Sequence, residues 1–387
     1  MKQTIKCIFA VFAAMLLSVA AFAQVTTSAL GGRVVDVNGE PVVGAAVIAT
    51  HTPSGTVYPV ITNEAGRYTM NGMRAGGPYT VEISCLGYQT VTFTDLNLQL
   101  AETFALNAEL NEDSELLSEA MVIGAAASKF SAQKMGSATN ISSNEITAVP
   151  TVSRSISDVT RLSPYGGNGM SFAGADGRTA NFTVDGANFN NNFGLSSNLP
   201  GGGNPISIDA IEEMQVVISP YDVRQTNFIG GGVNAITKSG TNTLKGSAYV
   251  YHRNENMRGN FVAGKEVSGA RDKDRNTTYG FTLGGPIIKN KLFFFVNAEY
   301  STIPTVVNRW RGTSEVDKNG EGVANPDAYI SRTTLKDLEE VSKFVSEKYG
   351  YDTGSWTDYP AVESNTKFLA RLDWNINDNH KLALRYN

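Results

Sequence analysis

Cysteine and histidine are scarce in this chain of 387 residues, which contains two of the former and three of the latter. Cys7 lies in an N-terminal apolar run, so a chain that loses this run keeps Cys85 alone and cannot form an intramolecular disulfide. Cys85 ends an alternating stretch with Tyr79, Val81 and Ile83, and we expect it to be buried in a core and not reactive.

Catalytic and metal-binding patterns are also missing. The three histidines, at positions 51, 252 and 380, are far apart, and no H-E-x-x-H motif or nucleophile–base pairing stands out. We therefore predict no enzyme activity, no metal site and no cofactor. The formal net charge of −5 leaves no excess of basic residues, so nucleic acid is not an expected partner.

The only long hydrophobic run lies at the N-terminus. Lys2 and Lys6 precede an apolar stretch at positions 7–21, and Ala21-Phe22-Ala23 follows as an A-x-A site. This order is typical of a secretory signal peptide, and the apolar stretch is short for a transmembrane helix. We predict a signal peptide over residues 1–23, with cleavage between Ala23 and Gln24.

Residues 24–110 contain short β-prone runs separated by turn signals such as Asn38-Gly39. This spacing predicts a small antiparallel β-sandwich. The opening of the region resembles the carboxypeptidase-regulatory-like domain, which implies no peptidase activity. The matching residues are Gly32, Val34, Asp36, Gly39, Pro41, Val42, Gly44, Ala45 and Val47.

The most informative stretch follows Ile208, where an apolar run leads through the glycines 230–232 into V-N-A-I-T and a further strand. Glycine permits positive φ and close backbone approach. The pattern resembles the end of the plug in TonB-dependent outer-membrane receptors of the Oar-like or SusC-like type, so we predict an α+β plug over residues 125–240. Its family motif comprises Arg178, Val184, Asp185 and Gly186, then Gly231, Gly232, Val233, Asn234, Ile236 and Thr237. An Asn-, Gly- and Ser-rich loop over 188–204 either faces substrate or is simply solvated.

Residues 111–124 are predicted to be a linker that contains a candidate Ton box, the segment that binds TonB in this family. The six candidate residues are Glu119, Ala120, Met121, Val122, Ile123 and Gly124. Strand addition needs only an extended, β-prone segment without proline, because main-chain hydrogen bonds supply the affinity. An ordinary edge strand would have the same composition.

Residues 241–387 alternate apolar and polar residues with a period of two in several runs, with Glu299, Arg371 and Asp373 on one face. Short turns at 286–291 and 377–380 alternate with long polar connections near 254–276 and 303–364, as in outer-membrane barrels. We predict about five antiparallel barrel strands. In the second long connection, Thr334 and Gly350 should cap a helix whose apolar face contains Leu335, Leu338, Val341 and Val345.

The expected fold class is mainly β: a sandwich, a plug and the first strands of an incomplete transmembrane barrel. Because family members close larger barrels, we expect an N-terminal fragment of a longer receptor, from a split gene, an incomplete sequence or a truncation.

The resemblance implies energy-coupled uptake of a large nutrient, such as a siderophore, an oligosaccharide or a peptide. The expected partners are the TonB–ExbB–ExbD complex, outer-membrane lipid and the nutrient, and a surface lipoprotein partner is left open. The barrel should lie in the outer membrane of a Gram-negative cell, with the N-terminal domain and Ton box in the periplasm. The alternative is a surface binding, adhesion or secretion-assembly protein without import. A secreted hydrolase would need an acid pair or triad, and none is found.

Overall fold

A computed structural model describes residues 25–112, 121–124, 137–151, 154–190, 199, 204–219, 225, 228–257, 259–266, 275–306, 310–354, 360–378 and 380–387. The predicted signal peptide and its cleavage site lie outside these residues, as do Glu119 and Ala120 of the candidate Ton box. The chain divides into two compact units: residues 1–246, 282–297 and 368–387 form the first, and residues 247–281 and 298–367 form the second.

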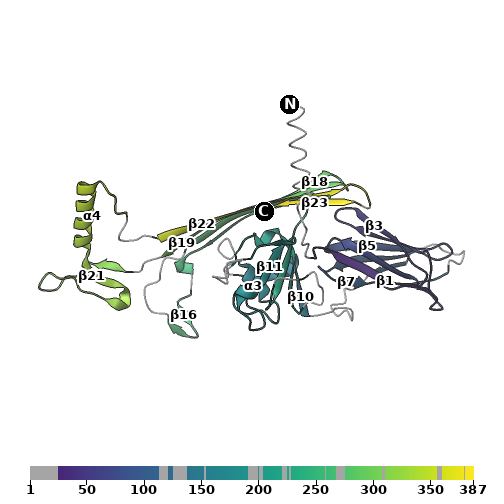
Figure 1. Cartoon of the computed structure of the whole chain (residues 1–387), viewed down its shortest axis with the longest axis horizontal. Helices are drawn as coiled ribbons and strands as arrows, with labels where there is room; N and C mark the ends of the chain where they lie inside the picture. Colours follow the sequence, from purple (N-terminus) through teal and green to yellow (C-terminus); the bar gives the residue numbers. More distant parts are fainter. Residues whose placement is uncertain are drawn as a thin grey trace, which may run out of the picture. The chain divides into compact units, whose positions relative to one another are not determined.

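The first domain of unit 1 is a β-sandwich (Figure 1). One sheet has the order β4-β1-β7, with β8 also paired to β1, and the other has the order β3-β2-β5-β6-β9. The strands are β1 (Ser28–Asp36), β2 (Ala46–His51), β3 (Thr56–Ile61), β4 (Arg67–Met73), β5 (Gly76–Ser84), β6 (Val91–Leu98), β7 (Thr103–Ala105), β8 (Ala108–Leu110) and β9 (Met121–Gly124).

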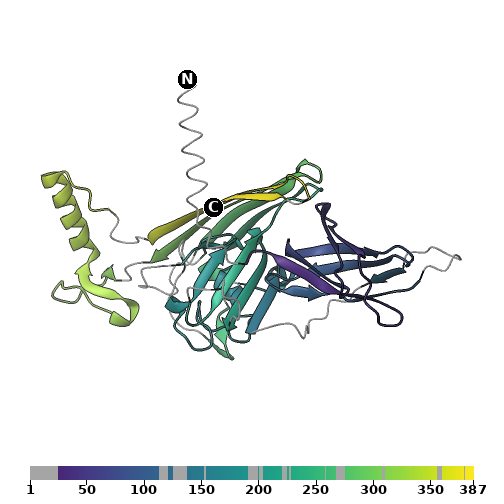
Figure 2. The same ribbon diagram turned by 45° about the vertical axis from the view of Figure 1, so that its right-hand side comes forward.

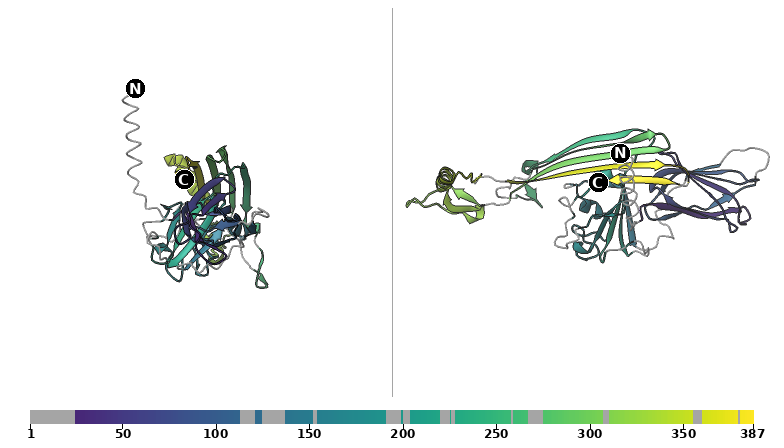
Figure 3. Two further views of the ribbon diagram at one scale, coloured as in Figure 1. Left: turned by 90° about the vertical axis from the view of Figure 1, so that its right-hand side faces the viewer. Right: turned by 45° about the horizontal axis from the view of Figure 1, so that its top comes forward.

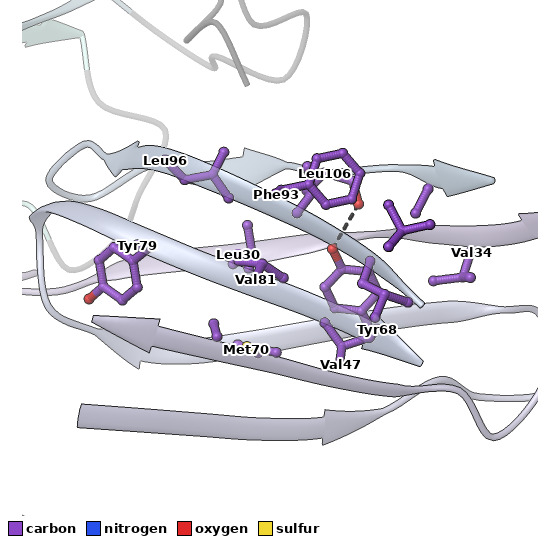
Figure 4. Packing of buried hydrophobic residues seen from close by; sticks show 14 of the residues in the cluster. Leu30, Val34, Val47, Tyr68, Met70, Tyr79, Val81, Phe93, Leu96 and Leu106 are labelled. Atoms are coloured by element: carbon purple, nitrogen blue, oxygen red, sulfur yellow. Dashed lines mark hydrogen bonds between the residues drawn. The ribbon is translucent and has the colours of Figure 1, made fainter. Parts of the chain in front are cut away.

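The sandwich core consists of the inward-facing residues of both sheets, which alternate with outward-facing residues along each strand (Figure 4). Tyr79, Val81 and Ile83 of β5 are fully buried, as their alternation predicts. The Tyr68 hydroxyl donates a hydrogen bond of 2.7 Å to the carbonyl oxygen of Leu106, which satisfies both polar groups inside the core.

Cys85 departs from the prediction, because it is only half-buried and still packs against the edge of the core. Strand β5 ends at Ser84, so the alternation that buries Tyr79, Val81 and Ile83 does not extend to position 85.

The second domain of unit 1 is a five-stranded sheet with two short helices, whose strands lie side by side in Figure 2. The sheet order is β10-β13-β14-β11-β12, and β11 and β14 pair in parallel. The elements are β10 (Ser137–Ser142), α2 (Ser143–Ala148), α3 (Ile156–Thr160), β11 (Asn181–Val184), β12 (Ala187–Asn188), β13 (Ile211–Ser219) and β14 (Gly232–Thr237). Every residue of β11 and β14 is buried, so these central strands are covered on both faces.

We call this second domain of unit 1 the central domain, and two of its local features follow from its sequence. Asp185 and Gly186 both have positive φ and close the two-residue hairpin between β11 and β12. The glycines at 230–232 do not have positive φ, contrary to one of the two reasons expected for them. They permit close approach instead, because a Cβ added at Gly231 would lie 2.9 Å from the Phe172 ring.

Five long antiparallel strands form a third sheet in the order β15-β18-β19-β22-β23 (Figure 3). They are β15 (Lys245–Arg253), β18 (Asn276–Ile288), β19 (Leu292–Val306), β22 (Pro360–Asn375) and β23 (Lys381–Tyr386). Residues 289–291 and 376–380 form short turns, whereas residues 254–275 and 307–359 are long connections. The predicted alternation of short and long connections is confirmed. Among the described residues, no helix is long and apolar enough to cross a membrane.

The two faces of this sheet differ as their alternation predicts. Glu299 and Asp373 are buried on one face, whereas Trp374 is exposed on the other. Phe295 and Leu369 are apolar residues on the first face, and they pack into the core of the central domain. Contact with that domain therefore explains why the inner face carries apolar side chains beside its charges.

The second long connection has its own small fold. It contains β20 (Arg311–Thr313), β21 (Ile330–Thr334) and α4 (Leu335–Tyr349), which Thr334 and Gly350 cap as predicted. The predicted apolar face is wrong at Val341, which is 60% exposed. Leu335 and Leu338 lie over Gly312, and Val345 is partly buried as well.

Candidate functional site

The Asp185 carboxylate is the centre of a polar network on the predicted plug motif. The hairpin turn presents it to β14, where Oδ1 accepts a hydrogen bond of 3.0 Å from the Thr237 amide and Oδ2 accepts one of 2.6 Å from the Thr237 hydroxyl. Only 5% of the Asp185 side chain is exposed. Two motif residues that are 52 positions apart are thus joined by a buried carboxylate.

Arginines from the long strands complete this network. Arg385 of β23 approaches Asp185 Oδ2 to 3.3 Å, and Arg371 Nη1 of β22 lies 4.0 Å from Asp185 Oδ1. Arg371 also donates to the Thr237 carbonyl oxygen, and it pairs bidentately with Asp373 at 2.8 and 3.0 Å. We call Asp185, Thr237, Arg371, Asp373 and Arg385 the Asp185 network.

The sandwich reaches the same network through Arg74, whose Nη2 lies 3.9 Å from Asp373. A buried charge left without its partner is costly, whereas a paired and hydrogen-bonded one is tolerated. The network therefore holds the central domain against β22 and β23 by reciprocal charges. Its contacts are ion pairs and hydrogen bonds between the two parts, so we interpret it as a structural link between them.

A second buried contact joins the sandwich to the central domain at Leu100. The Leu100 amide donates to Glu213 Oε1 at 2.9 Å, and the Leu100 carbonyl accepts from Gln215 Nε2 at 2.9 Å and from Asn140 Nδ2 at 3.0 Å. Asn140 and Gln215 are register partners on β10 and β13. We call Leu100, Asn140, Glu213 and Gln215 the Leu100 contact.

Glu213 is the titratable group of this contact. Burial raises the pKa of Glu213 to about 7, against the opposing effect of the hydrogen bonds from Leu100 and Asn140. Burial likewise raises the pKa of the neighbouring Glu212. A carboxyl that titrates near neutral pH therefore lies where the sandwich meets the central domain.

The described part of the candidate Ton box is strand β9. Its backbone pairs in parallel with β6, with Met121 opposite Val91 and Gly124 opposite Thr94. The segment therefore forms the last strand of a sandwich sheet. The sequence predicted an extended, β-prone segment here but gave no sign of this partner.

Unit 2 contains a smaller buried cluster on β15, β19 and β22. Glu299 accepts hydrogen bonds of 3.0 Å from the Tyr249 hydroxyl and 2.7 Å from Lys367 Nζ. Tyr249 lies over Gly280, where an added Cβ would come within 2.2 Å of its ring. These hydrogen bonds link β15, β19 and β22 through Glu299, and the cluster shares no residue with the Asp185 network.

The remaining motif residues have structural contacts. Asn234 is buried and donates 2.6 Å to the carbonyl oxygen of Val25, while Arg178 pairs with Asp176 on the surface. Val233 and Ile236 are core residues. Sequence reasoning missed Arg74, Glu213 and Arg385. Two signals pointed toward the network: the family motif contains Asp185 and Thr237, and the alternation placed Arg371 and Asp373 on one strand face.

Two family models match separate parts of this chain. The carboxypeptidase regulatory-like domain model matches residues 29–111, and the outer membrane beta barrel domain model matches residues 236–387. The TonB-dependent transporter Oar of Myxococcus xanthus is 25% identical over 396 residues, which covers 97% of this chain and 34% of that protein.

Two further relatives are more limited. The TonB-dependent receptor SusC of Bacteroides thetaiotaomicron is 33% identical over 119 residues, covering 31% of this chain and 10% of that protein. The crystal structure of the siderophore receptor PirA from Acinetobacter baumannii is 19% identical over 64% of this chain and 31% of that one, with a TM-score of 0.40. The chain spans about a third of the length of Oar.

The fold and these matches define an outer-membrane protein with an N-terminal regulatory-like sandwich. The expected resemblance to TonB-dependent outer-membrane receptors of the Oar-like and SusC-like type is confirmed, as are the mainly β fold class and the outer membrane as its location. Both curated relatives are named as a transporter or a receptor, and neither is named as an enzyme.

Proposed function

We propose that this chain takes part in TonB-dependent, energy-coupled uptake of a large nutrient across the outer membrane, without covalent chemistry. The observation that carries this proposal is that 97% of the chain aligns with a TonB-dependent transporter, at 25% identity. Residues 119–124 are the proposed contact with TonB, which acts with ExbB and ExbD. Strand addition suits this segment because its described part already pairs through its main chain.

In this proposal, residues 125–240 act as the plug. The ion pairs of the Asp185 network hold the plug to β22 and β23, and they must break before the plug can move. The network supports this role because its charges come from both the central domain and the long strands. Force applied at 119–124 would reach the central domain at β10, the first described strand after the segment.

The experiment replaces one residue of the segment in the complete receptor. Val122→Pro removes a main-chain donor and fixes φ, so it should abolish binding of the purified periplasmic domain of TonB. Val122→Thr is the matched control, because threonine keeps the N–H group and the β-branched shape. Binding is measured by titration of detergent-solubilised receptor, and circular dichroism checks that each variant is folded.

Loss of binding in Val122→Pro alone supports the assignment. Equal binding by both variants would mean that the segment is an ordinary linker strand. A folded receptor that retains TonB binding but imports nothing would favour the alternative of a surface binding or assembly protein.

A further inference from the structure

Strand β9 has one edge paired and one edge open among the described residues. Its four backbone positions pair with β6 in the parallel register Val91 to Met121, Thr92 to Val122, Phe93 to Ile123 and Thr94 to Gly124. Strand β6 pairs on its other side with β5, and β9 ends the sheet order. Main-chain groups of a strand point alternately to its two sides, so an edge strand keeps a row of unpaired donors and acceptors.

Few residues separate the described end of the sandwich from this strand along the chain. Glu112 bridges to Tyr88, and the Gln89 amide donates 2.8 Å to the Asn111 carbonyl oxygen, beside the residues that lead into β6. Residues 113–120 then connect this point to β9. A short tether gives the segment a high effective concentration at the β6 edge, which favours pairing within one chain.

We propose that the sandwich presents this segment to TonB as a preformed edge strand, so that the bound TonB sheet continues the sandwich sheet β3-β2-β5-β6-β9. The inference rests on the proposed TonB contact and adds the surface on which it forms. An isolated linker must be ordered when it binds, and ordering each residue lowers the affinity by about tenfold. A segment already paired with β6 avoids that loss.

The alternative relation between the two pairings is competition, in which β6 occupies the segment and TonB must displace it. The two relations predict opposite effects when β9 is locked onto β6. Because a strand has two edges, locking one edge leaves the other available for addition. Presentation therefore predicts that the locked chain binds TonB, and competition predicts that it does not.

The test locks the strand with a disulfide in the complete receptor. Thr92→Cys and Val122→Cys occupy register partners in neighbouring strands, a spacing that a disulfide can bridge, and Cys85→Ala removes the native thiol. Thr92→Cys with Ile123→Cys is the matched control, because it is one residue out of register. The in-register pair should oxidise readily and the shifted pair should not.

A separate variant weakens the pairing from the side of the sandwich. Thr94 faces Gly124 of β9 and lies where the β5–β6 register shifts, so Thr94→Pro affects the β9 edge with the least change to β5. Presentation predicts that Thr94→Pro weakens binding of the purified TonB periplasmic domain by at least about tenfold, since at least Gly124, which faces Thr94, must then be ordered on binding. The disulfide-linked variant gives an independent result if Thr94→Pro does not fold.

The outcomes separate the two proposals. Oxidised in-register protein that binds TonB at least as tightly as its reduced form supports presentation. Binding by the reduced form alone overturns presentation and leaves the TonB contact intact. Equal oxidation of the two cysteine pairs, or of neither, overturns the β6–β9 pairing. No binding by either redox form, together with no binding by the unmodified receptor, overturns the TonB contact and the presented edge with it.

Discussion

The Asp185 network makes a quantitative prediction for Asp185→Asn. The substitution keeps the shape of the side chain and one acceptor for the Thr237 amide, but it removes the charge that faces Arg385 and Arg371. Hydrogen bonds to charged groups contribute about 1.5–3 kcal/mol, and breaking a buried pair costs about 3–5 kcal/mol. Arg371 keeps its bidentate pair with Asp373, which lowers the second figure. We therefore expect a loss of about 2–4 kcal/mol in the local stability of β14.

Hydrogen exchange of the β14 amides measures this loss in the folded receptor. Because about 1.4 kcal/mol corresponds to tenfold in an equilibrium constant, exchange through local opening should accelerate by about 30-fold to about 700-fold. Asp176→Asn is the control, since its pair with Arg178 is about half exposed and the β14 amides should not respond. If the exchange rate of the β14 amides in Asp185→Asn rose by less than threefold, the Asp185 network would not stabilise this strand.

Three further substitutions test other parts of the molecule. Burial raises the pKa of Glu213 from 4.5 to about 7, so the stability that its protonated form contributes is fully present below pH 4.5 and is lost as the pH rises to 7. Glu213→Gln should remove this pH dependence of stability and raise the unfolding free energy at pH 8 by up to about 3 kcal/mol, measured by urea titration at pH 4.5 and 8. Gly280→Ala drives a Cβ into the Tyr249 ring and should cost about 1–3 kcal/mol in thermal unfolding, whereas Gly259→Ala has open space and should be neutral. Tyr68→Phe leaves the Leu106 carbonyl unsatisfied in the sandwich core and should cost about 1–3 kcal/mol by urea titration, and an unchanged midpoint would contradict that role.

Local features of this fold could be predicted because they depend on neighbouring residues. The period-two alternation of β19 and β22, the Asp185-Gly186 turn and the Thr334 and Gly350 caps each depend on a few consecutive positions. The predictions for Cys85 and Val341 failed for different reasons. Strand β5 ends at Ser84, before Cys85, whereas Val341 lies within α4 but is exposed to solvent.

The site itself could not be predicted from local patterns. Asp185 meets residue 237 and residue 385 across 52 and 200 positions, and the pairing of β9 with β6 is equally a product of the tertiary fold. Glu213 lies in a strand whose neighbours are mostly apolar, yet only the approach of Leu100 makes it a contact residue. Such contacts depend on how whole domains pack together, so no fixed spacing in the sequence predicts them.

The Leu100 contact has a consequence for how such a chain can evolve. On the sandwich side it uses the amide and carbonyl of one residue, together with an apolar side chain that packs near Ala75 and Ile236. On the other side it requires three particular polar side chains, Asn140, Glu213 and Gln215. At this contact the sandwich supplies only main-chain groups and one apolar side chain, so an apolar substitution of Leu100 should disturb it less than a substitution of Asn140, Glu213 or Gln215. The contact therefore constrains the sequence of the central domain more than that of the sandwich.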